Sequence, residues 1–164
     1  MCSSDLEKGI KTLIDAWKIW GLEAPELRII GDGVLLEELK SNSVNLNISF
    51  LGNLDEISVH QQISNSKLLI IPSECIEGCP LSLLEAYSYA TPVAVSDLGP
   101  LPQFIQNGNN GVIFEQSNAQ SLMETVRDLL HNEIKLQTLS VNCFNTFLNN
   151  FDLISNYKIL INIY

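Results

Sequence analysis

The chain has 164 residues, about one domain's worth of polypeptide. Apolar residues make up 46% of it and charged residues only 17%, which excludes an intrinsically disordered chain and a coiled coil. Nineteen acidic residues against nine basic ones give a net charge of −10, the opposite of what a nucleic-acid-binding surface or a polybasic membrane anchor needs. Any anionic ligand must therefore be bound by a few local donors.

Helical and strand patterns alternate along the chain. We expect helices at residues 10–20, 35–40, 54–64, 80–90, 101–106, 122–132 and 134–147, and a last one at 151–164. We expect strands at residues 27–30, 48–52, 67–72, 91–96 and 111–114. Short strands separated by helices are typical of the α/β class, here a doubly wound, parallel, Rossmann-like sheet with helices on both faces.

The sequence does not indicate a membrane span, a disulfide scaffold or a metal site. No apolar run approaches the roughly 20 residues of a membrane span. The chain does not open with a basic stretch followed by an apolar one, so we expect a cytoplasmic protein. Cys75 and Cys79 form a C-x3-C pair, but no second pair or nearby histidine completes a zinc site. We expect these two, Cys2 and Cys143 to be packing or loop residues, and the isolated His60 and His131 likewise.

Ligands of doubly wound sheets bind beyond the carboxyl ends of the strands. The most informative loop at such an end follows Ile71 and leads through a glycine and a proline into a helix. The first N–H groups of that helix form an anion site. Glu85 lies in the same helix among apolar or small residues, where a carboxylate is costly unless a partner hydrogen-bonds it. A vicinal diol such as ribose is one suitable partner; a salt bridge or an exposed helix edge is the alternative.

Seven residues separate Glu77 from Glu85. With its surroundings over residues 77–93, this pair resembles the E-x7-E signature of retaining glycosyltransferases of group 1 (family 4). Further segments resemble that family in the same order along the chain: 7–16, 27–33, 50–52 and 108–114. Each segment is weak evidence alone, and the ordered set is strong.

The resemblance implies the GT-B architecture, two Rossmann-like domains that face a cleft. Residues 1–150 would form the C-terminal, donor-nucleotide-binding domain, and residues 151–164 a helix that packs toward an N-terminal acceptor domain. Only seven residues precede Lys8, so we expect a truncated chain in which the first strand of the domain and the acceptor domain are missing.

The activity implied by the resemblance is transfer of a hexosyl group from a nucleoside-diphosphate sugar to a glycan or lipid-linked acceptor, with retention of configuration. The implied partners are the nucleotide sugar and that acceptor, and a peripheral membrane contact is compatible with the full-length protein. No metal or other cofactor is expected. We expect the isolated chain to be inactive, because catalysis needs the acceptor held in place by the other domain.

The resemblance also implies roles for individual residues. Lys8 would hold the donor diphosphate, Glu77 would contact the transferred sugar, and Glu85 would accept the ribose hydroxyls. The helix start would bind the pyrophosphate, the loop after residue 51 would border the base, and a glycine turn would allow close approach of the backbone. The residues at the helix start are Gly78, Cys79, Leu81 and Ser82. Those of the loop that borders the base are Gly52, Asn53 and Leu54. The glycine turn is at Gly31, with Gly33 beside it.

One departure keeps other functions open. The family usually carries an arginine five residues before the lysine of its opening motif, and Ser3 stands there. A non-catalytic nucleotide-sugar-binding or scaffold module of the same fold is therefore one alternative. Half of a sugar-nucleotide epimerase is another, and the residues that would decide it belong to the other domain.

Overall fold

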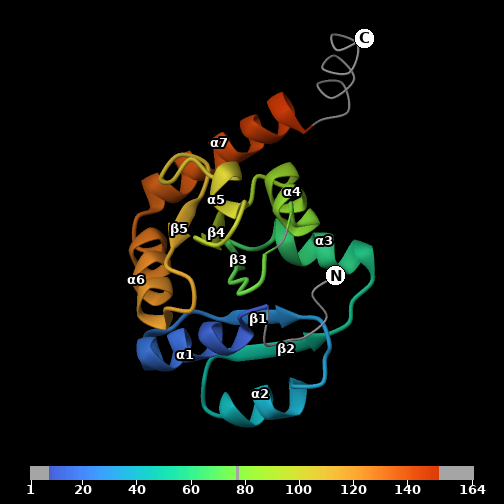
Figure 1. Ribbon diagram of the computed structural model, residues 1–164, viewed down its shortest axis with the longest axis vertical. Helices are drawn as coiled ribbons and strands as arrows, with labels where there is room; N and C mark the ends of the chain where they lie inside the picture. Colours follow the sequence, from blue (N-terminus) through green and yellow to red (C-terminus); the bar gives the residue numbers. More distant parts are fainter. Residues whose placement is uncertain (1–7, 77, 152–164) are drawn as a thin grey trace.

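The structure, a computed structural model, describes residues 8–76 and 78–151 (Figure 1). Its helices are α1 (Ile10–Trp20), α2 (Leu36–Asn42), α3 (Glu56–Ser64), α4 (Leu81–Ser88), α5 (Leu101–Phe104), α6 (Ala119–Leu130) and α7 (Glu133–Asn150), with a 3-10 turn, η1 (Gly21–Glu23). Its strands are β1 (Leu27–Ile30), β2 (Ile48–Gly52), β3 (Leu69–Ile71), β4 (Val93–Ser96) and β5 (Val112–Phe114). The expected order of elements is confirmed, and the last expected helix lies outside the described residues except for Phe151.

Capping side chains decide where several helices begin. Asp55 accepts a hydrogen bond from the Ser58 N–H (2.7 Å) at the start of α3, and this bond lowers the pKa of the Asp55 carboxyl. Asn118 likewise accepts from the Ser121 N–H (3.0 Å), so α6 begins at residue 119, earlier than the apolar stripe alone predicts. Local hydrogen bonding thus sets helix starts that the apolar periodicity alone does not locate: α3 begins two residues later than expected and α6 three residues earlier.

All recorded strand pairs are parallel, as expected, but the strands form two sheets. β1 pairs with β2, and β4 lies between β3 and β5. Figure 1 shows the β1–β2 pair below β3. Within the described residues no strand lies between β1 and β3, so the continuous sheet that the pattern predicts is interrupted at that place.

Helices cover both faces of the β3–β4–β5 sheet, which confirms the doubly wound arrangement. Alternate residues of β4 point to opposite faces. Ala94 packs in a core with α1 and α6, including Trp17 and Leu122. Val93 and Val95 pack in a second core with α4, α5 and α7. No helix within the described part of the chain is long and apolar enough to cross a membrane.

Tyr87 is the one side chain in this second core whose polar atom has no hydrogen-bond partner among the described residues. Its ring is fully buried, and burial raises the pKa of its hydroxyl. A buried polar group without a partner costs about 1–3 kcal/mol. We therefore expect Tyr87→Phe to raise the free energy of urea unfolding by about 1 kcal/mol. Tyr89→Phe is the matched control, because Tyr89 is exposed and should leave stability unchanged. A loss of stability in Tyr87→Phe would contradict the unsatisfied hydroxyl.

Candidate functional site

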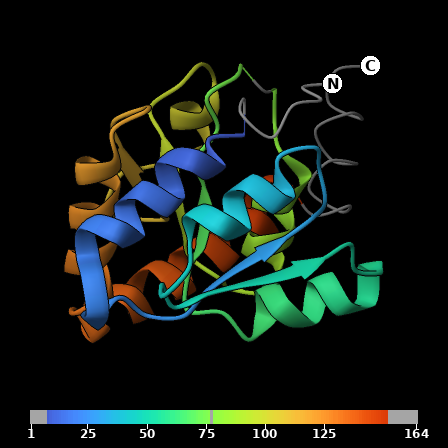
Figure 2. The ribbon, with the colours of Figure 1, turned by 90° about the horizontal axis from the view of Figure 1, so that it is seen from below.

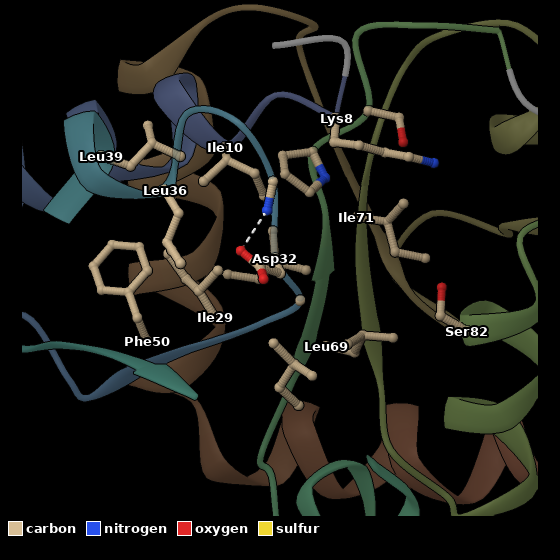
Figure 3. A pocket seen from close by; sticks show the side chains of 16 residues that line it. Lys8, Ile10, Ile29, Asp32, Leu36, Leu39, Phe50, Leu69, Ile71 and Ser82 are labelled. Carbon is tan, nitrogen blue, oxygen red and sulfur yellow. Dashed lines mark hydrogen bonds between the residues drawn. The ribbon is translucent and has the colours of Figure 1, made fainter. Parts of the chain in front are cut away.

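A pocket of about 480 Å³ lies where the carboxyl ends of β1 and β3 meet the starts of α1 and α4 (Figure 3). We call it the carboxyl-edge pocket. Apolar side chains form most of its wall, and its polar lining comes from the loops and helix starts around it. The polar and glycine residues that line it are Lys8, Gly31, Asp32, Gly33, Ser73 and Ser82.

A glycine turn closes one side of this pocket. Gly31 has φ +126°, a conformation that disfavours other residues, and its N–H donates to the Gly52 carbonyl (2.8 Å). This bond joins the loop after β1 to the last residue of β2. The Asp32 carboxylate accepts from the Gly33 N–H (2.8 Å), which fixes the turn further. The backbone of residues 31–33 therefore faces the pocket in a defined shape.

Lys8 enters the pocket from the start of α1. The next residue, Gly9, has φ +70°, and a Cβ there would lie 1.8 Å from the Pro72 carbonyl oxygen. The chain before α1 therefore packs directly on the loop after β3. In Figure 3 the side chains of Lys8 and Ser82 lie on one side of the pocket and Asp32 on the other. Among the described lining residues, Lys8 provides the positive charge and Asp32 the negative one.

The start of α4 presents backbone donors next to Lys8. Pro80 precedes the helix in an extended conformation and makes no side-chain cap. The Leu83 N–H makes the first backbone bond of the helix, to the Pro80 carbonyl (3.1 Å). The N–H groups of the first turn and the positive end of the helix dipole together attract anions. Ser82, in this first turn, lines the pocket.

Glu85 lies one turn further along α4 and faces a neighbouring cavity of about 580 Å³, which Ser82 also lines. Its half-buried side chain has His60 as a neighbour, with Nε2 3.8 Å from Oε1. His60 in turn packs against the Tyr89 ring, with centroids 5.4 Å apart. The sequence left a salt bridge as an alternative role for Glu85. His60 is the candidate partner, and it lies at the outer limit of ion-pair distance.

The structure brings some of the expected residues together. Lys8, Gly31 and Ser82 line the carboxyl-edge pocket, and Gly52 is bonded to its rim. Glu77 and Ser3 lie outside the described residues. The remaining expected residues do not line the pocket: Gly78, Cys79, Leu81, Asn53, Leu54 and Glu85.

Sequence reasoning missed two lining residues, Asp32 and Ser73. Ser73 is buried, and its carbonyl accepts from the Ser96 hydroxyl (2.7 Å), which ties the ends of β3 and β4 together. Both residues come within two positions of a strand end. A position just beyond the carboxyl end of a strand is therefore the sequence signal that marks both residues.

No group of three or more histidine, cysteine, aspartate or glutamate side chains that could hold a metal occurs among the described residues. Cys143 is fully buried, and burial raises the pKa of its thiol to about 12, so it packs as an apolar residue. Cys75 and Cys79 lie in the loop before α4, where Cys75 is half-buried and Cys79 is exposed. His131 is exposed at the end of α6.

Comparison with known proteins places the chain in a family. The model for "Glycosyl transferases group 1" matches residues 4–144. An uncharacterized glycosyltransferase of Methanocaldococcus jannaschii is 30% identical over 139 residues, which cover 83% of this chain and 38% of the relative. The UDP-Gal:alpha-D-GlcNAc-diphosphoundecaprenol alpha-1,3-galactosyltransferase of Escherichia coli is 28% identical, over 77% of this chain and 33% of that protein.

Solved structures agree with the fold. The crystal structure of Anabaena Alr3699/HepE in complex with UDP superimposes with a TM-score of 0.85 at 21% identity. The match covers 99% of this chain and 47% of the Anabaena chain. This chain therefore spans less than half the length of these relatives and has the fold of one part of them.

Proposed function

The chain belongs to the group 1 glycosyltransferases, which act by nucleotide-sugar-dependent transfer, and on that premise we propose that it supplies the donor site of a retaining hexosyltransferase. The donor would be a nucleoside-diphosphate sugar, and the acceptor a glycan or a lipid-linked glycan. The observation that supports this most is the meeting of Lys8, a glycine turn and the start of α4 around one pocket at the carboxyl ends of the strands.

The named ligands of related proteins favour a uridine nucleotide. The Anabaena structure holds UDP, and the name of the Escherichia coli relative gives UDP-Gal as its donor. A pocket that must hold a diphosphate in a chain of net charge −10 needs local donors. The described pocket offers the Lys8 ammonium group and the first turn of α4.

In this proposal the two donors act on the leaving group. As the bond between the sugar and the diphosphate breaks, negative charge grows on the phosphate oxygens. Lys8 meets that charge as an ammonium ion, and the α4 N–H groups meet it as fixed dipoles. Such preorganised donors stabilise the transition state more than the ground state, because they are aimed where the charge develops.

The sugar and base contacts are assigned by the same proposal. Glu85 would accept the ribose hydroxyls, since it follows Ser82 by three residues and so lies on the same side of α4. Glu77 would contact the transferred sugar. The base would lie near the loop after β2, at Gly52, Asn53 and Leu54. The acceptor and the second wall of the cleft would come from polypeptide outside these residues, so we expect no transfer by this chain alone.

Binding of UDP to the purified chain tests the donor site. We expect UDP at millimolar concentration to raise the melting temperature, with affinity measured by calorimetry. Lys8→Ala should weaken UDP binding about tenfold, because it removes a charge-assisted contact worth about 1.5 kcal/mol. It should leave the weaker binding of uridine unchanged. Glu85→Ala should weaken the binding of both UDP and uridine, because both ligands carry the ribose.

Two variants control for the change of charge. Lys11→Ala removes an exposed lysine from α1, and Glu124→Ala removes an exposed glutamate from α6; neither side chain lines the pocket or the neighbouring cavity. Both should bind UDP as the unaltered chain does. An absence of protection by UDP, GDP and ADP at millimolar concentration would refute the donor site.

A further inference from the structure

His60 on α3 faces two side chains of α4, Glu85 and Tyr89. Its Nε2 atom lies 3.8 Å from Glu85 Oε1, and its ring packs against the Tyr89 ring with centroids 5.4 Å apart. Glu85 and Tyr89 are joined by a backbone bond from the Tyr89 N–H to the Glu85 carbonyl (3.2 Å), so they lie one turn apart on the same side of α4. The imidazole is therefore held by the tyrosine ring with an edge toward the carboxylate.

The packing of α3 on α4 fixes His60 in this place. Val59 and Ile63 of α3 pack in the same core as Leu83 of α4. The Thr91 hydroxyl, in the turn after α4, donates to the Ile63 carbonyl near the end of α3 in a buried bond of 2.9 Å. His60 follows Val59 directly, so its backbone belongs to a segment that is tied to α4 by both apolar contacts and a hydrogen bond.

The same helix connects His60 to the loop after β2. Figure 2 shows that α3 begins at the carboxyl end of β2 and runs back along that strand. Asp55 caps the helix there, directly after Asn53 and Leu54, which the proposed function places beside the base. His60 therefore lies on the element that joins the proposed base site to Glu85, the proposed ribose site.

The Glu85 carboxylate can accept a bond from His60 and from a ribose at the same time. A carboxylate offers about four lone-pair positions on its two oxygens, and two ribose hydroxyls use two of them. A half-buried carboxylate that a neighbour holds in one orientation loses less freedom when a ligand binds. The 3.8 Å separation is longer than a hydrogen bond, and such bonds tighten when the ligand is bound.

We propose that His60 is a positioning residue for Glu85. Its Nε2–H donates to Oε1 in the donor complex and turns the carboxylate so that both oxygens accept from the ribose diol. A neutral imidazole supplies this donor from one of its two nitrogens, and the ring of Tyr89 keeps the imidazole in plane with its task. This inference rests on the proposed function, in which Glu85 accepts the ribose hydroxyls.

Binding of UDP and of deoxyuridine diphosphate, which lacks one hydroxyl of the ribose diol, tests the role of His60. The ratio of their dissociation constants, measured by NMR titration, reports the bond of that hydroxyl to Glu85, whereas a general loss of structure weakens both ligands alike. We expect the unaltered chain to prefer UDP about tenfold and Glu85→Ala to lose this preference. His60→Phe keeps a ring against Tyr89 but has no donor, so it should reduce the preference to about threefold.

Two variants show that the donor atom matters rather than the ring. His60→Gln places an amide N–H near the position of Nε2, and we expect it to keep the full preference for UDP. His131→Phe makes the same change as His60→Phe at an exposed position at the end of α6, and it should also keep the preference. If His60→Phe does not fold, His60→Ala takes its place with the same expected loss.

The outcomes separate the role of His60 from the function it rests on. No binding of UDP, or an unchanged preference in Glu85→Ala, would overturn the ribose site and the role of His60 together. A preference that is lost in Glu85→Ala but complete in His60→Phe would overturn the role of His60 alone. A stronger preference in His60→Phe would overturn it as well, because His60 would then compete with the ribose for Glu85.

Discussion

Gly9→Ala should lower the free energy of unfolding by about 3 kcal/mol or more. Two costs add at this position. The φ of +70° is unfavourable for any residue with a Cβ, and the new Cβ would lie 1.8 Å from the carbonyl oxygen of Pro72. The contacting atom belongs to the backbone directly after β3, so it cannot turn aside as a side chain would. Urea unfolding followed by circular dichroism measures the loss.

Gly108→Ala separates the two costs. Gly108 has φ +80°, but a Cβ there would meet no atom within 4 Å. We expect Gly108→Ala to lower the free energy of unfolding by only about 1–2 kcal/mol, which is the cost of the backbone conformation. Ala90, at φ +57°, shows that an alanine is tolerated in this region where space allows. Equal losses in the two variants would mean that the start of α1 can move away from Pro72.

The same contact explains a motif that the sequence could only associate with phosphate binding. The glycine after Lys8 stands out in the sequence by its place in a family pattern. The structure gives it a mechanical role, since a side chain there would push Lys8 and α1 off the loop after β3. Thr12 strengthens the same junction, because its hydroxyl donates to the Glu74 carboxylate (2.5 Å). Lys8 is therefore held near the start of α4 by packing at its neighbour.

Local patterns predicted the elements well because each depends on nearby residues. The apolar stripe from Ile10 to Trp20 and the short run from Leu27 to Ile30 coincide with α1 and β1. Parallel pairing followed from the alternation of strands and helices. The split between β1 and β3 was harder to predict from these patterns, because it depends on which strands become neighbours in space. The expectation of a missing first strand pointed in that direction only through the family resemblance.

The candidate site was predicted in part, for a related reason. The rule that ligands bind beyond the carboxyl ends of the strands identified the loops that surround the pocket. It could not show that Ser73 lines the pocket, because that depends on how the chain leaves β3. Nor could it show that Glu85 faces His60 and the neighbouring cavity of about 580 Å³, because this depends on the packing of α3 against α4. Contacts between elements distant in sequence decided each of these outcomes.

Trp17→Ala should cost about 3–5 kcal/mol of stability, the largest effect we expect from a core substitution in this chain. The indole is 2% exposed and packs in the core that joins α1 to α6. Its Nε1 also donates to the Pro25 carbonyl (2.8 Å), just before β1 begins. Removal of the ring therefore leaves a cavity and also frees the segment that leads into β1. Thermal and urea unfolding measure the loss.

Two further variants divide this effect. Trp17→Phe keeps most of the apolar ring and loses the bond to Pro25, so it should cost about 1–2 kcal/mol. Trp20→Ala removes the neighbouring indole, 5.5 Å away between centroids but only partly buried, and should cost less than Trp17→Ala. If Trp17 mainly holds β1 in place, Trp17→Phe will also speed amide exchange in β1 and leave β4 unchanged. Equal exchange in both strands would assign the whole effect of Trp17→Phe to packing.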